Sequence, residues 1–141
     1  MAETTSNMLD KTEICPCGSG KGYQQCCAPL HQGTQVATTA EQLMRSRYSA
    51  YALKEIDYLY ETLYPEKRSE DYKAEMAAWA NRAEFTRLEI LAKKQGRSLD
   101  KTGKVEFIAY YRQFGEEKQM HEISRFRRYR GRWHYVDGEI S

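Results

Sequence analysis

The sequence predicts an α+β fold in which three helices are followed by a four-stranded antiparallel sheet, with a small cysteine-rich element at the start. Apolar residues recur about every 3.6 positions from residue 40 to residue 82, which is the period of an amphipathic helix. From residue 86 to residue 136 they alternate instead, as in strands with one buried face. Because no helical segment separates these strands, neighbours are expected to pair antiparallel, and the fold is α+β rather than α/β.

All four cysteines of the 141-residue chain lie within residues 15–27. Zinc prefers four soft ligands at the corners of a tetrahedron, and short loops with paired cysteines supply them. Cysteines this close together do not easily reach the geometry of two disulfides, so a metal site is favoured. We predict Cys15, Cys17, Cys26 and Cys27 as the ligands, with His31 as the alternative to Cys27.

The run from Cys15 to Lys21, with Tyr23 and the pair Cys26-Cys27, resembles the SEC-C motif. This motif is the small zinc element at the C-terminus of the preprotein translocase ATPase SecA, and the resemblance implies the same four cysteine ligands here. Gly22 departs from the family, which usually has lysine or another polar residue at that position. Four protein ligands leave no position for a reactive water, so we expect Zn²⁺ to be structural and to be required for this segment to fold.

The composition, 40% hydrophobic and 30% charged, is that of one main domain with this appendage. We expect a flexible lead-in over residues 1–14, the zinc element over 15–31 and the α+β domain over 38–141. No apolar run approaches the length of a membrane span, and the first residues lack a signal-peptide pattern, so we expect no membrane association and a cytoplasmic location. The net charge of +2 does not by itself indicate a nucleic-acid partner.

The helical part follows a linker expected over residues 28–37. Thr38 or Thr39 forms a capping-box pattern with Gln42 at the start of a first helix, whose apolar positions continue to Ala52. A second helix is expected over 56–63, ended by Pro65, and a third over 71–82.

Four strands are expected over residues 86–93, 105–111, 119–129 and 133–136. Glycine-containing turns separate them, at 95–103, at 115–117 and at 130–132. Short turns between consecutive strands indicate a meander.

Several segments of the second part resemble the YchJ family of uncharacterised bacterial proteins. They are the runs from Met44 to Tyr51, from His121 to Phe126 and from Gly131 to Gly138, which follow an N-terminal SEC-C motif. The resemblance covers nearly the whole chain and implies a nuclear-transport-factor-two-like fold, also called SnoaL-like. In this fold the helices pack into the concave side of a curved sheet and form a cone. Because the family has no established biochemical role, the resemblance predicts architecture rather than activity.

A cone of this type encloses a pocket between its first helix and the sheet. In such a pocket His121 would act as acid or base, and Arg125 would hold a carboxylate or stabilise negative charge. The two residues share one face of a strand; if that face is the outer one, Glu122, Ser124 and Phe126 face inward instead. Packing in the core is the alternative role for the aromatic candidates. The pocket candidates are Tyr48, Tyr51, Trp79, Tyr111, His121 and Arg125.

Residues 125–132 carry five arginines interleaved with aromatic residues. Such a hairpin could contact phosphates and stack bases. A solvated hairpin is the alternative, because arginines on a strand divide between two faces and Glu116, Glu117 and Glu122 lie nearby.

Three functions remain open at this point. We favour a protein-interaction module in which the zinc element presents Pro16, Lys21, Tyr23 and Gln24 to a protein partner, as the resemblance to SecA implies. The alternatives are a small-molecule binder or enzyme that uses the cone pocket, and an RNA- or ribosome-associated protein that uses the arginine hairpin. The sequence contains no nucleophile elbow and no phosphate-binding glycine loop, so catalysis is not favoured. A dimer formed through the sheet is also open.

Overall fold

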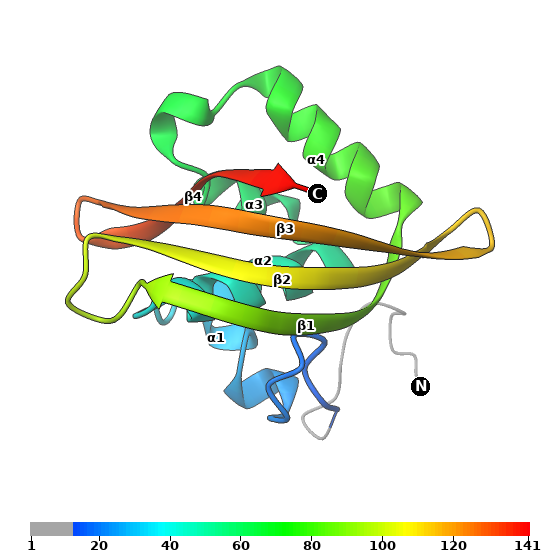
Figure 1. Ribbon diagram of the computed structural model, residues 1–141, viewed down its shortest axis with the longest axis horizontal. Helices are drawn as coiled ribbons and strands as arrows, with labels where there is room; N and C mark the ends of the chain where they lie inside the picture. The colour runs from blue at the N-terminus through cyan, green and yellow to red at the C-terminus, as the bar shows by residue number, and fades with distance from the viewer. Residues whose placement is uncertain (1–12) are drawn as a thin grey trace.

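The computed structural model describes residues 13–141, and its centre is a four-stranded antiparallel sheet (Figure 1). The strands follow one another in chain order, so each is joined to the next by a hairpin. The strands are β1 Glu84–Gln95, β2 Thr102–Gln113, β3 Glu116–Tyr129 and β4 Arg132–Ile140. The predicted α+β meander is confirmed, although each strand is longer than the alternating pattern indicated.

Backbone pairing extends the strands beyond their buried residues. At the β2–β3 hairpin, Gln113 pairs with the exposed Glu116 across a two-residue turn. Phe114 and Gly115 in this turn have φ values of 54° and 77°, as in the tight hairpin turns whose twist matches that of the strands. At such strand ends, apolar and polar residues no longer alternate because solvent surrounds both faces. The sequence pattern therefore underestimates the length of the strands.

The helices precede the sheet. They are α1 Ala28–Gln32, α2 Ala40–Leu53, α3 Ile56–Glu61 and α4 Glu70–Arg82, with single turns of 3₁₀-helix at η1 Tyr23–Gln25 and η2 Pro65–Lys67. The predicted start of α2 is confirmed: the Gln42 backbone N–H donates to the Thr39 side-chain oxygen at 3.0 Å, and Gln42 Oε1 accepts from the Thr38 N–H at 2.8 Å. No helix in the described part of the chain combines the length and apolar composition needed to cross a membrane.

Two expectations about the N-terminal region change. The predicted linker over 28–37 contains the short helix α1, whose Ala28 and Leu30 are buried. Two apolar contacts in a single turn are too few to form a periodic pattern, so the sequence did not indicate this helix. Of the predicted flexible lead-in, residues 1–12 lie outside the described residues, whereas Ile14 pairs with Gly22 and so belongs to the cysteine-rich element.

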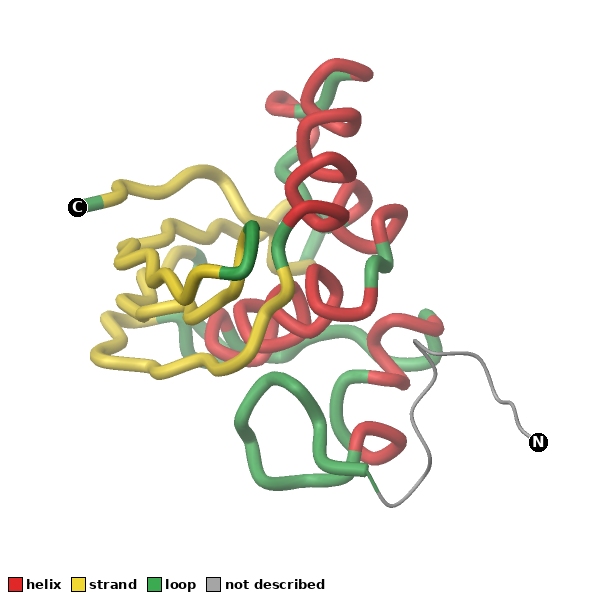
Figure 2. Tube along the Cα trace, turned by 90° about the vertical axis from the view of Figure 1, so that its right-hand side faces the viewer, coloured by secondary structure: helices red, strands yellow, loops and turns green. Residues whose placement is uncertain are grey.

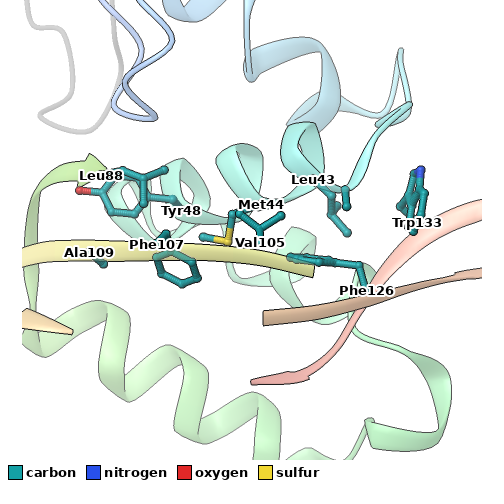
Figure 3. Close-up of a cluster of buried hydrophobic side chains, with 10 residues drawn as sticks. Leu43, Met44, Tyr48, Leu88, Val105, Phe107, Ala109, Phe126 and Trp133 are labelled. Atoms are coloured by element: carbon teal, nitrogen blue, oxygen red, sulfur yellow. The ribbon is translucent and has the colours of Figure 1, made fainter. Parts of the chain in front are cut away.

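The hydrophobic core lies between α2 and one face of the sheet (Figure 3). Leu43, Met44 and Tyr48 project from α2 toward inward side chains of the strands, among them Phe107 and Phe126. All helices lie on this side of the sheet, and no helix of the described residues covers the other face (Figure 2). The core therefore has one layer of helix against one layer of sheet, as expected for a cone.

The last strand is tied to the helices at its edge. Tyr135 exchanges backbone hydrogen bonds with the segment after α3, accepting from Tyr64 N–H at 2.8 Å and donating to Thr62 O at 2.8 Å. On α4, Trp79 stacks on Phe85 of β1 with ring centroids 4.9 Å apart. The first contact fixes the end of α3 to β4, and the second places α4 beside a cavity that Trp79 and Phe85 help to line.

Candidate metal centre and cone pocket

The cysteine-rich element, which we call the knuckle (residues 13–33), is a small loop closed by backbone pairing. Ile14 pairs with Gly22, and Cys15 N–H donates to Lys21 O at 2.8 Å. Gly18 and Gly20 have φ values of 82° and 88°, a region that strains residues with a side chain, so the turn depends on glycine at these positions. The turn brings the sulfurs of its two cysteines toward the pair that follows η1.

The four sulfurs form one compact group. Every Sγ of Cys15, Cys17, Cys26 and Cys27 lies within 4.8 Å of the others. Cys17 Sγ is 3.5 Å from Cys26 Sγ, and Cys26 Sγ is 3.9 Å from Cys27 Sγ. A tetrahedron with metal–sulfur bonds of about 2.3 Å has edges of about 3.8 Å. The four cysteines are free thiols, and both their chemistry and their spacing fit a tetrahedral metal ion.

The thiols also influence one another's ionisation. The pKa of Cys17 is lowered because the Cys15 and Cys27 thiols donate hydrogen bonds to its sulfur, and Ser19 adds to the effect. The pKa of Cys15 rises to about 12 because its thiol is held as a donor to Cys17, and the pKa of Cys27 rises because its thiol donates to Cys15 and Cys17. The protein groups therefore favour one thiolate, and full ionisation of all four needs a cation among them.

His31 lies outside the sulfur group and has a structural role instead. Its Nδ1 is 2.8 Å from Tyr23 Oη, and its Nε2 is 2.9 Å from the carbonyl oxygen of Ser46 on α2. Because a carbonyl only accepts, Nε2 carries the proton and Nδ1 accepts from the tyrosine. Burial lowers the pKa of His31, which favours this neutral form. His31 thus links the knuckle to α2, and Cys27 is the fourth member of the sulfur group.

Arg45 on α2 makes a second link between the knuckle and the cone. Its Nη1 donates to Cys17 O at 2.7 Å, and its Nε donates to Glu41 at 2.9 Å. Leu53, at the end of α2, packs with the buried cysteines and Tyr23. The knuckle is therefore docked against one side of α2, beside the β1 edge of the sheet (Figure 1).

The surface of the knuckle differs from the predicted one at Tyr23. This residue is 8% exposed because its hydroxyl turns inward to His31, so the prediction that it faces a partner is wrong. Lys21 is exposed, and Pro16 and Gln24 are partly exposed. A polar groove of about 540 Å³ runs between the knuckle and α2, with lining that includes Ser19, Lys21, Gln25, Cys26, Gln42 and Arg45.

The cone contains a separate cavity of about 180 Å³ between α2, α4 and the inner face of the sheet. Of the six predicted pocket residues, Tyr48, Tyr51 and Trp79 line it. Tyr111 is not part of the lining but supports it, because its ring packs edge-on against Trp79 with centroids 5.0 Å apart. Aromatic residues from helix and sheet thus form most of the wall.

The prediction that His121 and Arg125 line the pocket is wrong, because they lie on the outer face of β3. His121 Nε2 contacts Glu106 Oε2 at 2.6 Å, and Arg125 forms a two-pronged ion pair with Asp137 at 2.6 and 2.5 Å. Alternation along the strand turns Glu122 and Ser124 inward instead, and both line the cavity. The sequence predicts that side chains of β3 alternate between two faces. It does not predict which set faces inward, because that depends on the helices packed against the strand.

Two groups of opposite charge lie in the cavity; the alternative orientation of β3 anticipated Glu122, whereas Arg47 was not among the predicted pocket residues. Arg47 of α2 and Glu122 of β3 are 5% and 7% exposed, and both line it. The sequence could have indicated Arg47 as a pocket residue. It lies one helical turn before Tyr51, on a helix face whose neighbouring positions are apolar or aromatic.

The arginine hairpin is partly engaged in internal contacts. Besides the pairing of Arg125, Arg128 donates to the carbonyl oxygens of Asp100, Ser98 and Gly131, and its guanidinium lies 4.5 Å from the Trp133 ring. Arg127, Arg130 and Arg132 are exposed. The five arginines therefore do not form a single open patch.

Comparison with known proteins agrees with this architecture of a cysteine knuckle and a cone. Residues 12–29 match the SEC-C motif, and residues 39–138 match the family described as "YchJ, middle NTF2-like domain". The molecule is thus an NTF2-like cone preceded by a SEC-C motif. The chain belongs to the YchJ family.

Relatives that match most of this chain occur in several bacteria. A UPF0225 protein of Geobacter sulfurreducens is 43% identical over 127 residues, covering 90% of this chain and 79% of the relative. A UPF0225 protein of Corynebacterium efficiens is also 43% identical over 127 residues, covering 90% of this chain and 93% of the relative.

Two solved structures share the fold over nearly the whole chain. A SEC-C motif containing protein from Rhodopseudomonas palustris, solved in solution, is 45% identical with a TM-score of 0.81, covering 90% of this chain and 98% of its own. A SEC-C motif containing protein from Psychrobacter arcticus, solved by crystallography, is 29% identical with a TM-score of 0.78, covering 95% and 86%. The knuckle and the cone therefore occur together in these solved structures as well.

Proposed function

We propose that the chain is a protein-interaction module in which Cys15, Cys17, Cys26 and Cys27 bind a structural zinc ion and the cone serves as a scaffold. The observation that carries the proposal is the group of four free sulfurs within 4.8 Å, spaced as the corners of a zinc–thiolate tetrahedron. Zinc is the cation of choice because an all-thiolate tetrahedral site suits it and excludes hard cations. Four free thiols also suit a reducing compartment, and we place the protein in the cytoplasm.

The interaction surface is the groove between the knuckle and α2. Its lining is mainly polar, with Lys21, Gln25 and Gln42 among its side chains. Such a surface suits a partner segment recognised by hydrogen bonds. Since the zinc ligands and α2 form the two sides of this groove, metal binding would fix its width, and the zinc would act on binding through folding rather than through direct contact.

The test is affinity capture from a bacterial lysate with quantitative mass spectrometry, comparing the intact chain with two variants. Cys17→Ser removes a ligand, whereas the double substitution Lys21→Ala and Gln25→Ala changes only exposed side chains and keeps all four cysteines. We expect a protein enriched by the intact chain to be lost with both. Trp79→Phe, which changes the separate cone cavity, serves as the matched control and should retain it. A partner captured equally by all variants would contradict the proposal.

A further inference from the structure

The cone cavity carries two nearly buried groups of opposite charge in an aromatic setting. Arg47 comes from α2 and Glu122 from β3, and the rings of Tyr51, Trp79 and Phe85 contribute to the wall. Ile140, which is 67% exposed at the end of β4, also lines the cavity, so the cavity opens to solvent there, near α4 (Figure 1). Buried charges in an apolar wall are costly, and they occur where something binds them or where they hold the fold together.

Arg47 is only partly engaged by the protein. Its Nη1 donates to Leu59 O and to Thr62 Oγ1, both at 2.7 Å, and the Tyr135 ring lies 4.7 Å from the guanidinium carbon. Within residues 13–141, no carboxylate lies within 4.0 Å of it, and its Nε and Nη2 make no hydrogen bond. The two bonds from Nη1 account for a structural role, but the remaining N–H groups form a fork that suits a carboxylate.

Glu122 is held in place as an acceptor. Its Oε2 accepts from Ser124 Oγ at 2.6 Å and from Tyr135 Oη at 2.9 Å, whereas its Oε1 has no partner among the described residues. Gly138 on β4 lies against this carboxylate, and a Cβ at that position would overlap it. Glycine there makes room for the acid, which is fixed while one oxygen remains available.

The two groups can be reached by one small molecule. Arg47 lies over the ring of Tyr135, and Glu122 accepts from the hydroxyl of the same side chain. The cavity volume of about 180 Å³ is below the range of drug-sized pockets, about 300–1,000 Å³, and resembles a cavity of about 150 Å³ that admits benzene. One aromatic ring with small substituents is the size that fits.

We propose that the cone binds a single-ring organic acid whose carboxylate pairs with Nε and Nη2 of Arg47 and whose hydroxyl or amine donates to Glu122. The aromatic walls take the ring. The ligand supplies the anion that Arg47 lacks and the donor that Glu122 lacks, so both buried charges become satisfied. This site is independent of the knuckle, because none of its groups contacts the four cysteines.

Heteronuclear NMR of the metal-loaded full chain tests the proposal, with para-hydroxybenzoate as the probe. The chain has two tryptophans: Trp79 lines the cavity, whereas Trp133 is buried elsewhere and donates from its indole to Thr38 O. We expect para-hydroxybenzoate to shift the Trp79 indole signal in a saturable way and to leave that of Trp133 in place. Benzoate lacks the second donor and para-hydroxybenzyl alcohol lacks the carboxylate, and each should bind about tenfold more weakly or worse.

Three variants assign the contacts. Arg47→Met should weaken para-hydroxybenzoate by about tenfold or more, and Glu122→Gln should reduce its advantage over benzoate. Leu99→Ala is the control, because this side chain is 94% exposed and does not line the cavity, and it should leave affinity unchanged. If Arg47→Met does not fold, the affinities of the three compounds for the intact chain and for Glu122→Gln still test the proposal. Equal binding of the three compounds, or no shift of Trp79 up to about 10 mM, would overturn the proposal.

Discussion

The knuckle and the cone keep their shapes by different means. The apolar cluster of the knuckle is small: its buried members are three cysteines, Tyr23 and Ala28, and among residues 13–141 the cone adds Leu53 alone. The cone instead buries a continuous layer between α2 and the sheet. With the proposed zinc bound, the metal offsets the conformational entropy of a loop with few apolar contacts, whereas the cone is stabilised by burial of apolar surface. The two regions should therefore respond to different perturbations.

The largest effect is expected from removing one sulfur, which should disrupt the knuckle and leave the cone folded. Cys17→Ser should abolish tight metal binding, because the apparent binding free energy of structural zinc sites is about 10–16 kcal/mol and depends on all four ligands. Hydrogen exchange should then show loss of protection across residues 14–22, while the paired strands of the cone retain theirs. Loss of protection throughout β2 and β3 would show that the cone also depends on the metal.

A substitution in the core of the cone should have the opposite outcome, destabilising the cone and leaving the metal site of the knuckle intact. Phe126 is 1% exposed, and Phe126→Ala should lower the free energy of unfolding by about 3–5 kcal/mol because it leaves a cavity. Denaturant unfolding measures this, and the metal content per folded chain should stay the same. Phe114→Ala is the matched control, since Phe114 is 84% exposed at a hairpin turn and its loss should change stability little. A loss of metal in Phe126→Ala would mean that the regions are more tightly coupled than we infer.

A smaller effect is expected where the two regions meet. Arg45→Met removes the bond from Nη1 to Cys17 O and should cost about 1–3 kcal/mol, because a charge-assisted contact is lost and a carbonyl is left without its donor. Exchange of knuckle amides should quicken while the metal remains bound. Arg82→Met, at the exposed end of α4, provides a comparison that should leave both readouts unchanged. Identical behaviour of the two variants would rule out Arg45 as the link.

The smallest effect concerns pH and is confined to the cone. Burial lowers the pKa of His134, so below its ordinary value of about 6.5 the unfolded chain binds a proton more readily than the folded one. Stability should therefore fall as the pH drops through this range. His134→Gln should flatten the plot of unfolding free energy against pH in this range. Subtracting the plots of the two proteins removes the contribution of the metal site, because both proteins contain it. Parallel curves would show that His134 does not titrate on unfolding.

The sequence predicted the parts of this molecule that depend on local patterns. The clustered cysteines, the Thr39–Gln42 cap and the change from helical to alternating periodicity are set by neighbours in the chain, and each is found in the structure. What could not be predicted depends on contacts between distant segments. The phase of β3, which places Glu122 rather than His121 inside, is fixed by the packing of α2 against the sheet.

His31 illustrates the same limit on a smaller scale. Its position four residues after Cys27 suggested a ligand, and nothing local to it indicated a bond to α2. In the structure its Nε2 reaches Ser46, which lies 15 residues further along the chain. A residue type that suits a metal site can thus serve as a structural link, and only the tertiary contact distinguishes the two.

The ratio of zinc to protein in chain purified without added metal tests the central claim most directly. We expect one zinc ion per chain by elemental analysis, retained in His31→Ala and lost in Cys17→Ser. Absence of stoichiometric metal, together with sulfurs oxidised in pairs, would contradict the tetrathiolate site and the interaction surface that depends on it.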